Sequence, residues 1–363
     1  MSATQTSEAF EQYREDTTGF RNYLHDLADD LFPFDGYRGY QDELLYEIVE
    51  AYFIDGYRNI VVEGPTGIGK SPVNVTVGRV ITVLHRLQSE IGDHFGVEIT
   101  GLNTGNSFYT TPQKSLRNQL AEDDDLQPYV EMLKARADYT CGETGQNCSQ
   151  CSIKSDSDQS CRDQMDCTYW SAKMRSREHP QAAITFAMLI VDNYLPEEDE
   201  KGPLSFRDRD LVTVDEGHNS EGQSASLFAG FTLSPYSLPN DVYANAGDLT
   251  DWDAERFEDV EGVLSQIEQR ANQFIDQFED IEQRQAGVEQ CEEKLRKLRY
   301  CRQTHNQGRG WVVNINEVGI PGSQETTKSI QMKPVRVDDF LADFVWSRGR
   351  RRLITSATIP FRG

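Results

Sequence analysis

A glycine-rich segment constrains the fold of this chain more than any other feature of the sequence. It reads Gly64-Pro65-Thr66-Gly67-Ile68-Gly69-Lys70-Ser71 and fits the spacing G-x-x-x-x-G-K-[ST]. The segment follows an apolar, strand-like run at 59–63 and precedes a helix expected from about Lys70 to Ser89. In this context the glycines let backbone N–H groups surround phosphates at a helix N-terminus. We therefore expect the segment to bind ATP, with Lys70 supplying positive charge and the Ser71 hydroxyl ligating Mg²⁺.

Further strand-like runs alternate with helical patterns along the chain. A helical pattern covers 40–53, and the strand candidates are 108–110, 182–185, 211–215 and 352–355. This alternation predicts an α/β fold with a parallel sheet and crossover helices. From about Ser234 to Ser329, apolar residues instead recur every three or four positions, which predicts a helical hairpin inserted between two strands.

Two adjacent carboxylates follow one of the strand candidates. The apolar run 211–214 leads directly into Asp215 and Glu216, at the carboxyl end of the strand. We expect Asp215 to hold Mg²⁺, directly or through water, and Glu216 to be the base that polarises the attacking water. With a phosphate loop upstream, the pair predicts an enzyme that hydrolyses ATP.

The chain is strongly acidic. It has 60 Asp and Glu against 36 Lys and Arg, a formal net charge of -24. Because the acidity is dispersed, it favours a protein adapted to molar salt, where the Debye length falls to about 3 Å and self-repulsion is screened. The competing interpretation is an acidic protein that repels nucleic acid or binds a basic partner. The net charge alone does not exclude a DNA-binding groove.

The sequence carries no signal for a membrane. No run approaches the roughly 18 apolar residues of a spanning helix, and the N-terminus has neither a basic start nor an apolar stretch. We expect a cytoplasmic protein without a membrane partner.

Five of the seven cysteines fall within the short segment 141–167. Such clustering in an intracellular chain indicates a metal or cofactor site better than a disulfide framework. Thiolates can hold an iron–sulfur cluster or a structural Zn²⁺, and spacing alone does not exclude zinc. The other two, Cys291 and Cys301, lie in the predicted helical hairpin, and we expect them to be buried there as small hydrophobic residues.

Several of these motifs resemble those of superfamily 2 helicases. Asp215-Glu216-Gly217-His218 resembles their D-E-x-H box and Ser356-Ala357-Thr358 their motif III, while Arg38 and Gln41 match the R-x-x-Q adenine-reading element and 108–116 looks like motif Ia. The resemblance implies a RecA-like P-loop sheet and catalytic roles for Lys70, Asp215 and Glu216. It also implies that His218 couples the ATP site to motif III, and that Ser356 and Thr358 lie near the nucleotide.

The cysteine segment narrows the resemblance to XPD/DinG-like iron–sulfur DNA helicases. Residues 134–141 resemble the K-G-R-x-N-Y-x-C start of their cluster segment, and Cys167-Thr168-Tyr169-Trp170 resembles its C-P-Y-[YW] end. This implies a 4Fe-4S cluster bound by four of the five cysteines Cys141, Cys148, Cys151, Cys161 and Cys167. Cys141 and Cys167 match the outer positions. XPD-like spacing adds Cys148 and Cys151, whereas DinG-like spacing takes one of these with Cys161, and the choice stays open.

The resemblance also divides the chain into segments. They are an N-terminal segment (1–35), a RecA-like ATPase domain in three parts (36–136, 180–233 and 330–363), an iron–sulfur cluster domain (137–179) and a helical arch-like insertion (234–329). In the family the cluster domain and the arch flank a hole for single-stranded DNA. The candidate wall residues here are Tyr169, Trp170, Lys173, Arg175 and Arg177.

The resemblance covers the N-terminal half of such a helicase. No Q-x-x-G-R-x-x-R pattern, typical of the second motor domain, occurs in the sequence. We therefore expect the ATP-binding motor half of a 5′-3′ helicase from an extreme halophile or its virus. It would act on single-stranded or forked DNA, with a C-terminal helicase-domain polypeptide as partner. The alternatives are a non-catalytic module that binds ATP and single-stranded DNA, and a truncated helicase fragment.

Overall fold

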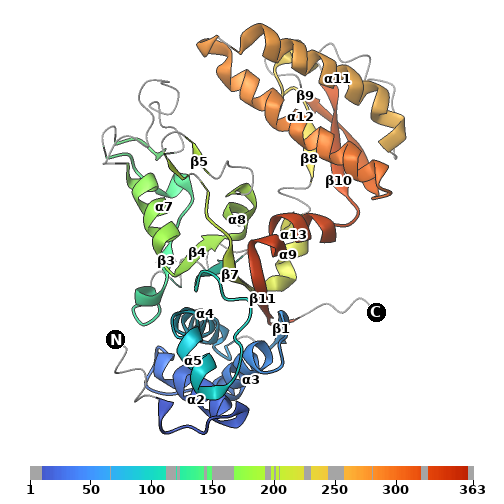
Figure 1. Ribbon diagram of the computed structural model, residues 1–363. Coiled ribbons are helices and arrows are strands. Elements are labelled where there is room, and N and C mark those ends of the chain that lie inside the picture. Colours follow the sequence, from blue (N-terminus) through green and yellow to red (C-terminus); the bar gives the residue numbers. More distant parts are fainter. Residues whose placement is uncertain are drawn as a thin grey trace. The chain divides into compact units, whose positions relative to one another are not determined.

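The computed structural model forms two compact units, Met1–Ser220 with Ala342–Gly363, and Glu221–Leu341 (Figure 1). The structure describes residues 10–65, 67–111, 120, 123–142, 145–148, 167–192, 198–199, 202–203, 205–224, 230–243, 257–279, 281–319 and 326–358. Each unit has its own core of buried apolar side chains.

The first unit is built on a six-stranded parallel sheet with the strand order β1-β11-β7-β2-β4-β3. Its strands are β1 (Asn59–Glu63), β2 (Ser107–Thr111), β3 (Glu131–Met132), β4 (Gln181–Thr185), β7 (Arg209–Asp215) and β11 (Gly349–Ser356). The central strands β2 and β7 are buried along their whole length, and their middle residues are mostly apolar, aromatic or β-branched. The predicted α/β class with a RecA-like parallel sheet is confirmed, and each predicted strand is present.

Helices cover this sheet and connect its strands. They are α2 (Thr17–Leu31), α3 (Gln41–Phe53), α4 (Lys70–Arg86), α5 (Gln88–Phe95), α7 (Thr168–Glu178) and α8 (Phe186–Asp192). Residues 1–35, expected to precede the domain, contribute α2, whose Phe20 and Leu24 are buried in the same core as α3 and α4. The expectation of one helix to about Ser89 was wrong at its end. The backbone leaves the helical region at Leu87, and α5 then places Ile91 and Phe95 in the core.

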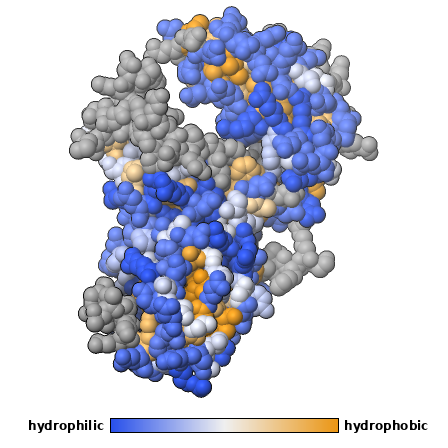
Figure 2. All heavy atoms as spheres, viewed as in Figure 1, coloured by the Kyte–Doolittle hydropathy of each residue, from blue (hydrophilic) through white to orange (hydrophobic). Residues whose placement is uncertain are grey.

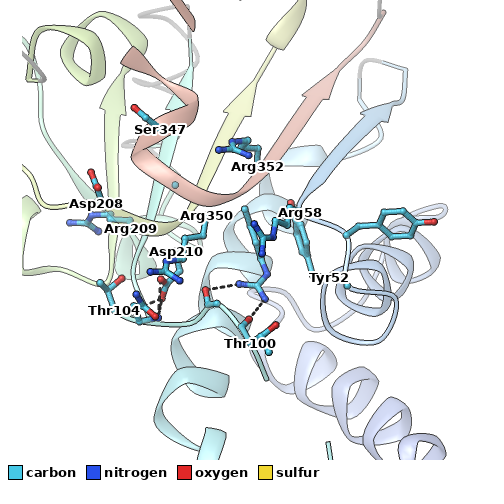
Figure 3. A pocket seen from close by; sticks show the side chains of 16 residues that line it. Tyr52, Arg58, Thr100, Thr104, Asp208, Arg209, Asp210, Ser347, Arg350 and Arg352 are labelled. Atoms are coloured by element: carbon cyan, nitrogen blue, oxygen red, sulfur yellow. Dashed lines mark hydrogen bonds between the residues drawn. The ribbon is translucent and has the colours of Figure 1, made fainter. Parts of the chain in front are cut away.

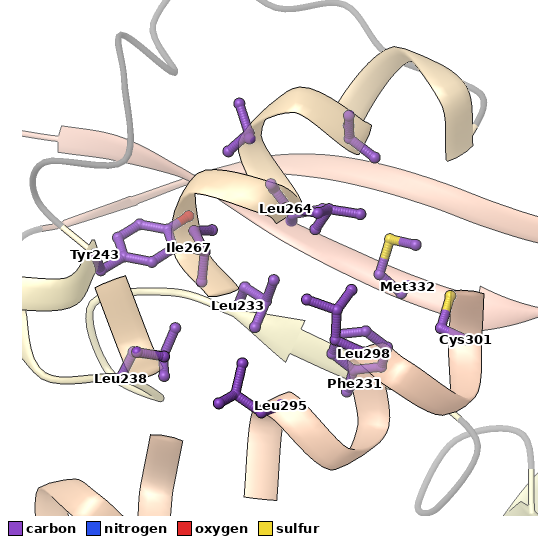
Figure 4. Packing of buried hydrophobic residues seen from close by; sticks show 14 of the residues in the cluster. Phe231, Leu233, Leu238, Tyr243, Leu264, Ile267, Leu295, Leu298, Cys301 and Met332 are labelled. Carbon is purple, nitrogen blue, oxygen red and sulfur yellow. The ribbon is translucent and has the colours of Figure 1, made fainter. Parts of the chain in front are cut away.

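The second unit packs a helical hairpin and a small antiparallel sheet together. The long helices are α11 (Phe257–Phe278) and α12 (Gln285–Asn306), and the sheet has the order β8 (Phe231–Leu233), β10 (Thr326–Pro334), β9 (Trp311–Gly319). Figure 4 shows Leu264 and Leu298 of the helices facing Leu233 and Met332 of the sheet. The hairpin is as predicted, but the sheet was not expected.

Shorter elements complete the described chain. They are α9 (Ser220–Gln223), α10 (Asn240–Tyr243), α13 (Asp338–Phe344) and the two-residue strands β5 (Glu198–Asp199) and β6 (Gly202–Pro203). Cys291 and Cys301 are fully buried in the core of the second unit, as predicted, and burial raises the pKa of the Cys291 thiol to about 11.

Hydrophilic residues cover most of the face seen in Figure 2, in keeping with the formal net charge of -24. Within the described part of the chain, no helix is both long enough and apolar enough to span a bilayer.

Candidate nucleotide site

The glycine-rich segment forms the turn from the end of β1 to the start of α4. Gly67 and Gly69 adopt left-handed backbone angles, with φ of 86° and 79°, and Lys70 is the first residue of the helix. The Lys70 ammonium is buried and donates to the carbonyl oxygens of Gly64 at 3.0 Å and Pro65 at 3.4 Å. The lysine therefore lies inside the loop in which it was predicted to bind phosphate. Ile68 and Ser71 are part of this turn and helix start, and Thr66 lies outside the described residues.

Gln41, the first residue of α3, is hydrogen-bonded to this loop. Its side-chain oxygen accepts from the Arg38 backbone N–H at 2.7 Å, and its Nε2 donates to the Gly69 carbonyl at 2.9 Å. The left-handed φ favours glycine at 69, and a Cβ there would lie 2.0 Å from that Nε2 and would displace the Gln41 amide from this contact.

A hollow of about 250 Å³ adjoins this contact. Phosphate-loop residues and apolar side chains share its wall; its lining includes Phe34, Arg38, Gln41, Gly67, Gly69, Ser71 and Leu126. The hollow thus joins the predicted adenine-reading pair to the phosphate loop.

Asp215 ends β7 beside the end of β11, and three donors hold its buried carboxylate. Its Oδ2 accepts from the Tyr109 hydroxyl at 2.7 Å, and its Oδ1 accepts from the Thr355 hydroxyl and the Glu216 backbone N–H, each at 3.0 Å. Asn74 Nδ2 donates to the Thr355 hydroxyl at 2.9 Å. A carboxylate accepts about four hydrogen bonds, so one position remains on Oδ2. Asp215 can therefore hold a metal-bound water without losing its protein partners.

Tyr109, Asn74 and Thr355 belong to this site but were not predicted as parts of it. Asn74 lies one helical turn after Lys70, and Thr355 pairs with Asp215 across the β7–β11 ladder. Both residues could have been predicted as parts of this site once the strand order was known. Burial, and then the Asp215 charge, raise the pKa of Tyr109 well above its usual value, so its hydroxyl remains a donor.

Glu216 is held in an unusual backbone conformation. Its φ of 55° is the one positive φ among the described non-glycine residues, and such angles cost energy and often mark functional sites. Its carboxylate lies 3.9 Å from the Lys70 ammonium and 3.2 Å from His218 Nδ1. The next residue must be Gly217, because a Cβ there would lie 2.4 Å from a methyl carbon of Ile354. The turn thus aims Glu216 at the phosphate loop.

His218 joins this carboxylate to the end of β11. Its Nδ1 lies 2.8 Å from the Ser356 hydroxyl, and that hydroxyl donates to the Thr358 carbonyl at 2.8 Å. Ser356 must then accept from the ring, so the Nδ1 of His218 carries the proton. The Ser356 carbonyl in turn accepts from the Gly64 N–H at 2.9 Å. The acidic box, the end of β11 and the phosphate loop therefore form one connected network.

Three of the clustered cysteines lie in the described part of the first unit. Cys141 and Cys148 flank a tight loop, in which the Cys148 N–H donates to the Tyr139 carbonyl at 2.9 Å. Cys167 precedes α7, whose Thr168 hydroxyl donates to the Thr140 carbonyl at 2.8 Å and joins the two segments. Cys151 and Cys161 lie outside the described residues. Among the residues described, no three Cys, His, Asp or Glu side chains gather closely enough to hold a metal.

The expected DNA-wall residues differ in exposure: Arg175 is exposed, Trp170 and Arg177 are half-buried, and the other two are buried. Tyr169 and Lys173 are buried, and Lys173 pairs with the buried Asp192 at 3.2 Å, so their assignment to a DNA-facing wall was wrong. A buried carboxylate needs such a cation, which explains why Lys173 points inward. Arg175 pairs with Glu131 at 2.9 Å, and Arg177 donates to the Ser205 carbonyl at 3.2 Å. The motif Ia residues 112–116 lie outside the described chain.

Comparisons with known proteins add little to this geometry. No protein-family profile and no curated protein matches the chain. A solved structure described as "Structure of S. tokodaii Xpd4" is similar to it, with 14% sequence identity and a TM-score of 0.42. The match covers 89% of this chain and 58% of that one, so this chain spans little more than half of its length. Similarity at this level supports no inference about function. Any such inference must rest on the residues of the site itself.

Proposed function

We propose that this chain is the ATP-binding motor half of a DNA-dependent ATPase and 5′-3′ DNA helicase of the XPD/DinG-like kind. The observation that supports this best is the convergence of Lys70, Gln41 and the Asp215–Glu216 pair on one loop. ATP would bind with its phosphates in the turn 64–71 and its base in the hollow beside Arg38 and Gln41. Single-stranded or forked DNA would be the activator and substrate.

Each group at the site has a distinct task in phosphoryl transfer. The Lys70 ammonium neutralises phosphate charge, and Glu216 orients and polarises the attacking water. Ser71 and the free position on Asp215 would hold Mg²⁺, which supplies charge stabilisation when bound. His218 positions the Glu216 carboxylate, because its Nδ1 proton lies between that carboxylate and Ser356.

Full activity would require a second RecA-like domain, provided by a partner polypeptide. Arginines of such a domain are worth about 10³–10⁵ in the rate of phosphoryl transfer. We place this activity in the cytoplasm of a halophile, because dispersed acidity keeps a protein soluble in molar salt. The chain alone is expected to bind Mg·ATP and to hydrolyse it slowly.

Nucleotide binding in molar KCl, followed by DNA-stimulated ATP turnover, tests this proposal. Lys70→Ala should weaken ATP binding at least tenfold. Lys297→Ala, which breaks a surface pair with Glu293 on α12, should leave binding unchanged. Turnover should rise when a polypeptide carrying Q-x-x-G-R-x-x-R is added. Equal ATP affinity of the two variants would refute the nucleotide site. Tight ATP binding with no turnover in any mixture would instead leave a non-catalytic binding module.

A 4Fe-4S cluster held by the clustered cysteines is the second part of the proposal. It is supported by the linkage of the Cys141–Cys148 loop to the start of α7 after Cys167. Anaerobically purified protein should absorb broadly near 400 nm and contain iron. Cys141→Ser should abolish the absorbance, and Cys291→Ser, in the second unit's core, should preserve it. Stoichiometric zinc without iron after anaerobic reconstitution would show a zinc site instead.

A further inference from the structure

A second hollow lies at the amino edge of the parallel sheet, where β1, β7 and β11 begin. Its volume is about 790 Å³, within the usual range for small-molecule sites. Figure 3 shows Arg58, Arg350, Asp210 and Thr100 around it, all from the first unit. The candidate ATP site is at the carboxyl edge, where the same strands end. This hollow is therefore a separate feature of the unit.

The balance of charge in the hollow is the reverse of that of the chain. Five arginines line it against two aspartates, although acidic residues outnumber basic ones by 60 to 36 overall. The lining arginines are Arg58, Arg209, Arg350, Arg351 and Arg352. Asp210 is already engaged by the backbone N–H groups of Asn103, Thr104 and Gly105 at 2.7–3.0 Å. Asp208 lies on the exposed rim, 3.5 Å from Arg348. The carboxylates thus leave most of this positive charge without a counter-ion.

Two of the arginines are structural. Arg209 is buried and donates to backbone carbonyls, among them those of Ser107 at 3.0 Å and Ser176 at 2.9 Å. Arg352 donates to the Trp346 carbonyl and to Asn59. Their donors serve the fold, and they supply positive charge to the hollow without being free to contact a ligand.

The other three arginines have donors to spare. Arg351 is buried and donates to the carbonyls of Thr100 and Gly101, but its Nε is buried without a hydrogen-bond partner in the described structure. Arg350 is exposed and donates to the side-chain oxygen of Asn103. The exposed Arg58 guanidinium has no hydrogen-bond or ion-pair partner among the described residues. Burial lowers the pKa of Arg351; the nearby Asp210 and Tyr52 oppose this, and repulsion by Arg58 and Arg350 adds to it more weakly. A dianion between these side chains would relieve that repulsion.

We propose that this hollow binds a small phosphorylated ligand, with the exposed Arg58 and Arg350 contacting its phosphate oxygens and the buried Arg351 adding positive charge to the hollow. Guanidinium groups recognise phosphate through paired, charge-assisted hydrogen bonds. A small ligand fits this site because the arginines are gathered around one hollow of about 790 Å³, the size of a small-molecule pocket. The proposal does not depend on ATP binding at the carboxyl edge.

Equilibrium dialysis with radiolabelled pyrophosphate tests this site, using the Lys70→Ala chain so that the phosphate loop contributes little. Pyrophosphate should bind this chain, and adding Arg58→Gln with Arg350→Gln should weaken its affinity at least tenfold. Both arginines are exposed, so neither substitution should disturb folding. Adding Arg14→Gln with Arg336→Gln removes the same charge from surface ion pairs elsewhere and should change the affinity less than twofold.

Three results would overturn the proposal. The first is no pyrophosphate binding by the Lys70→Ala chain. The second is an equal loss in both double-arginine variants, which would indicate an effect of overall charge. The third is displacement of pyrophosphate by a single-stranded oligonucleotide at equal phosphate concentration, which would assign the hollow to nucleic acid.

Discussion

The two edges of the six-stranded sheet differ in how their surroundings affect a buried charged side chain. At the carboxyl edge, Asp215 accepts from three neutral donors, one on β2, one on β11 and one in the next residue, and its charge is stabilised in place. At the amino edge, burial, together with the weaker repulsion by Arg58 and Arg350, disfavours the charge of Arg351 and lowers its pKa, against the attraction of Asp210. Parallel α/β sheets usually carry their ligand sites at the carboxyl edge. The comparison indicates that here the amino edge also departs from a purely structural role.

The largest expected effect is on catalysis at the carboxyl edge. Glu216→Gln keeps the shape of the side chain and removes the base, so DNA-stimulated ATP turnover with the partner domain should fall by about 10²–10⁴. ATP affinity should stay within about threefold, because Lys70 and the loop glycines are untouched. Single-turnover kinetics and nucleotide titration separate the two. Unchanged turnover would remove Glu216 from the reaction.

At the amino edge the largest expected effect is on stability. The Asp210 carboxylate is buried and accepts from three consecutive backbone N–H groups of the loop before β2. Asp210→Asn removes the charge and replaces one of the two accepting oxygens by an amide NH₂ group, which can only donate. It should lower the free energy of unfolding by about 2–4 kcal/mol, since hydrogen bonds to charged groups are worth about 1.5–3 kcal/mol each.

Denaturant titration measures this loss, with Asp208→Asn as the matched control. Asp208 is exposed, with 74% of its side chain accessible, and its substitution should change stability by less than about 0.5 kcal/mol. Similar values for both variants would show that the loop does not depend on Asp210.

The sequence predicted the first unit well because its signals are local. Buried strands such as β2 and β7 contain short runs of apolar, aromatic and β-branched residues, and the phosphate loop is a single contiguous segment. β11 was predicted only from 352 onward, although it begins at Gly349. Its buried Arg351 donates to the distant Thr100 and Gly101 carbonyls, and no local sequence pattern encodes this contact.

In the second unit, the sequence predicted the helices but not the sheet. The apolar stripes of α11 and α12 were readable, whereas β9 and β10 were missed. Along β9, Trp311 and Val313 are buried, but the exposed Asn314, Asn316 and Glu317 interrupt the apolar pattern. In the candidate site the motif residues were likewise readable. Their partners Tyr109 and Asn74 were not, because strand order and packing bring them to Asp215 and Thr355.

The smallest expected effects come from two buried tyrosines, one at each edge. The Tyr109 hydroxyl donates to Asp215 at 2.7 Å, whereas the Tyr52 hydroxyl is buried without a hydrogen-bond partner in the described structure and lines the amino-edge hollow. Tyr109→Phe leaves a carboxylate oxygen without its donor and should cost about 1–3 kcal/mol of unfolding free energy. Tyr52→Phe removes an unsatisfied polar atom from the interior, so it should be neutral or stabilising by up to about 1 kcal/mol. Parallel denaturant titrations of the two variants measure the difference. If Tyr52→Phe proves as costly as Tyr109→Phe, the Tyr52 hydroxyl has a partner, and the two edges differ less than their hydrogen bonds indicate.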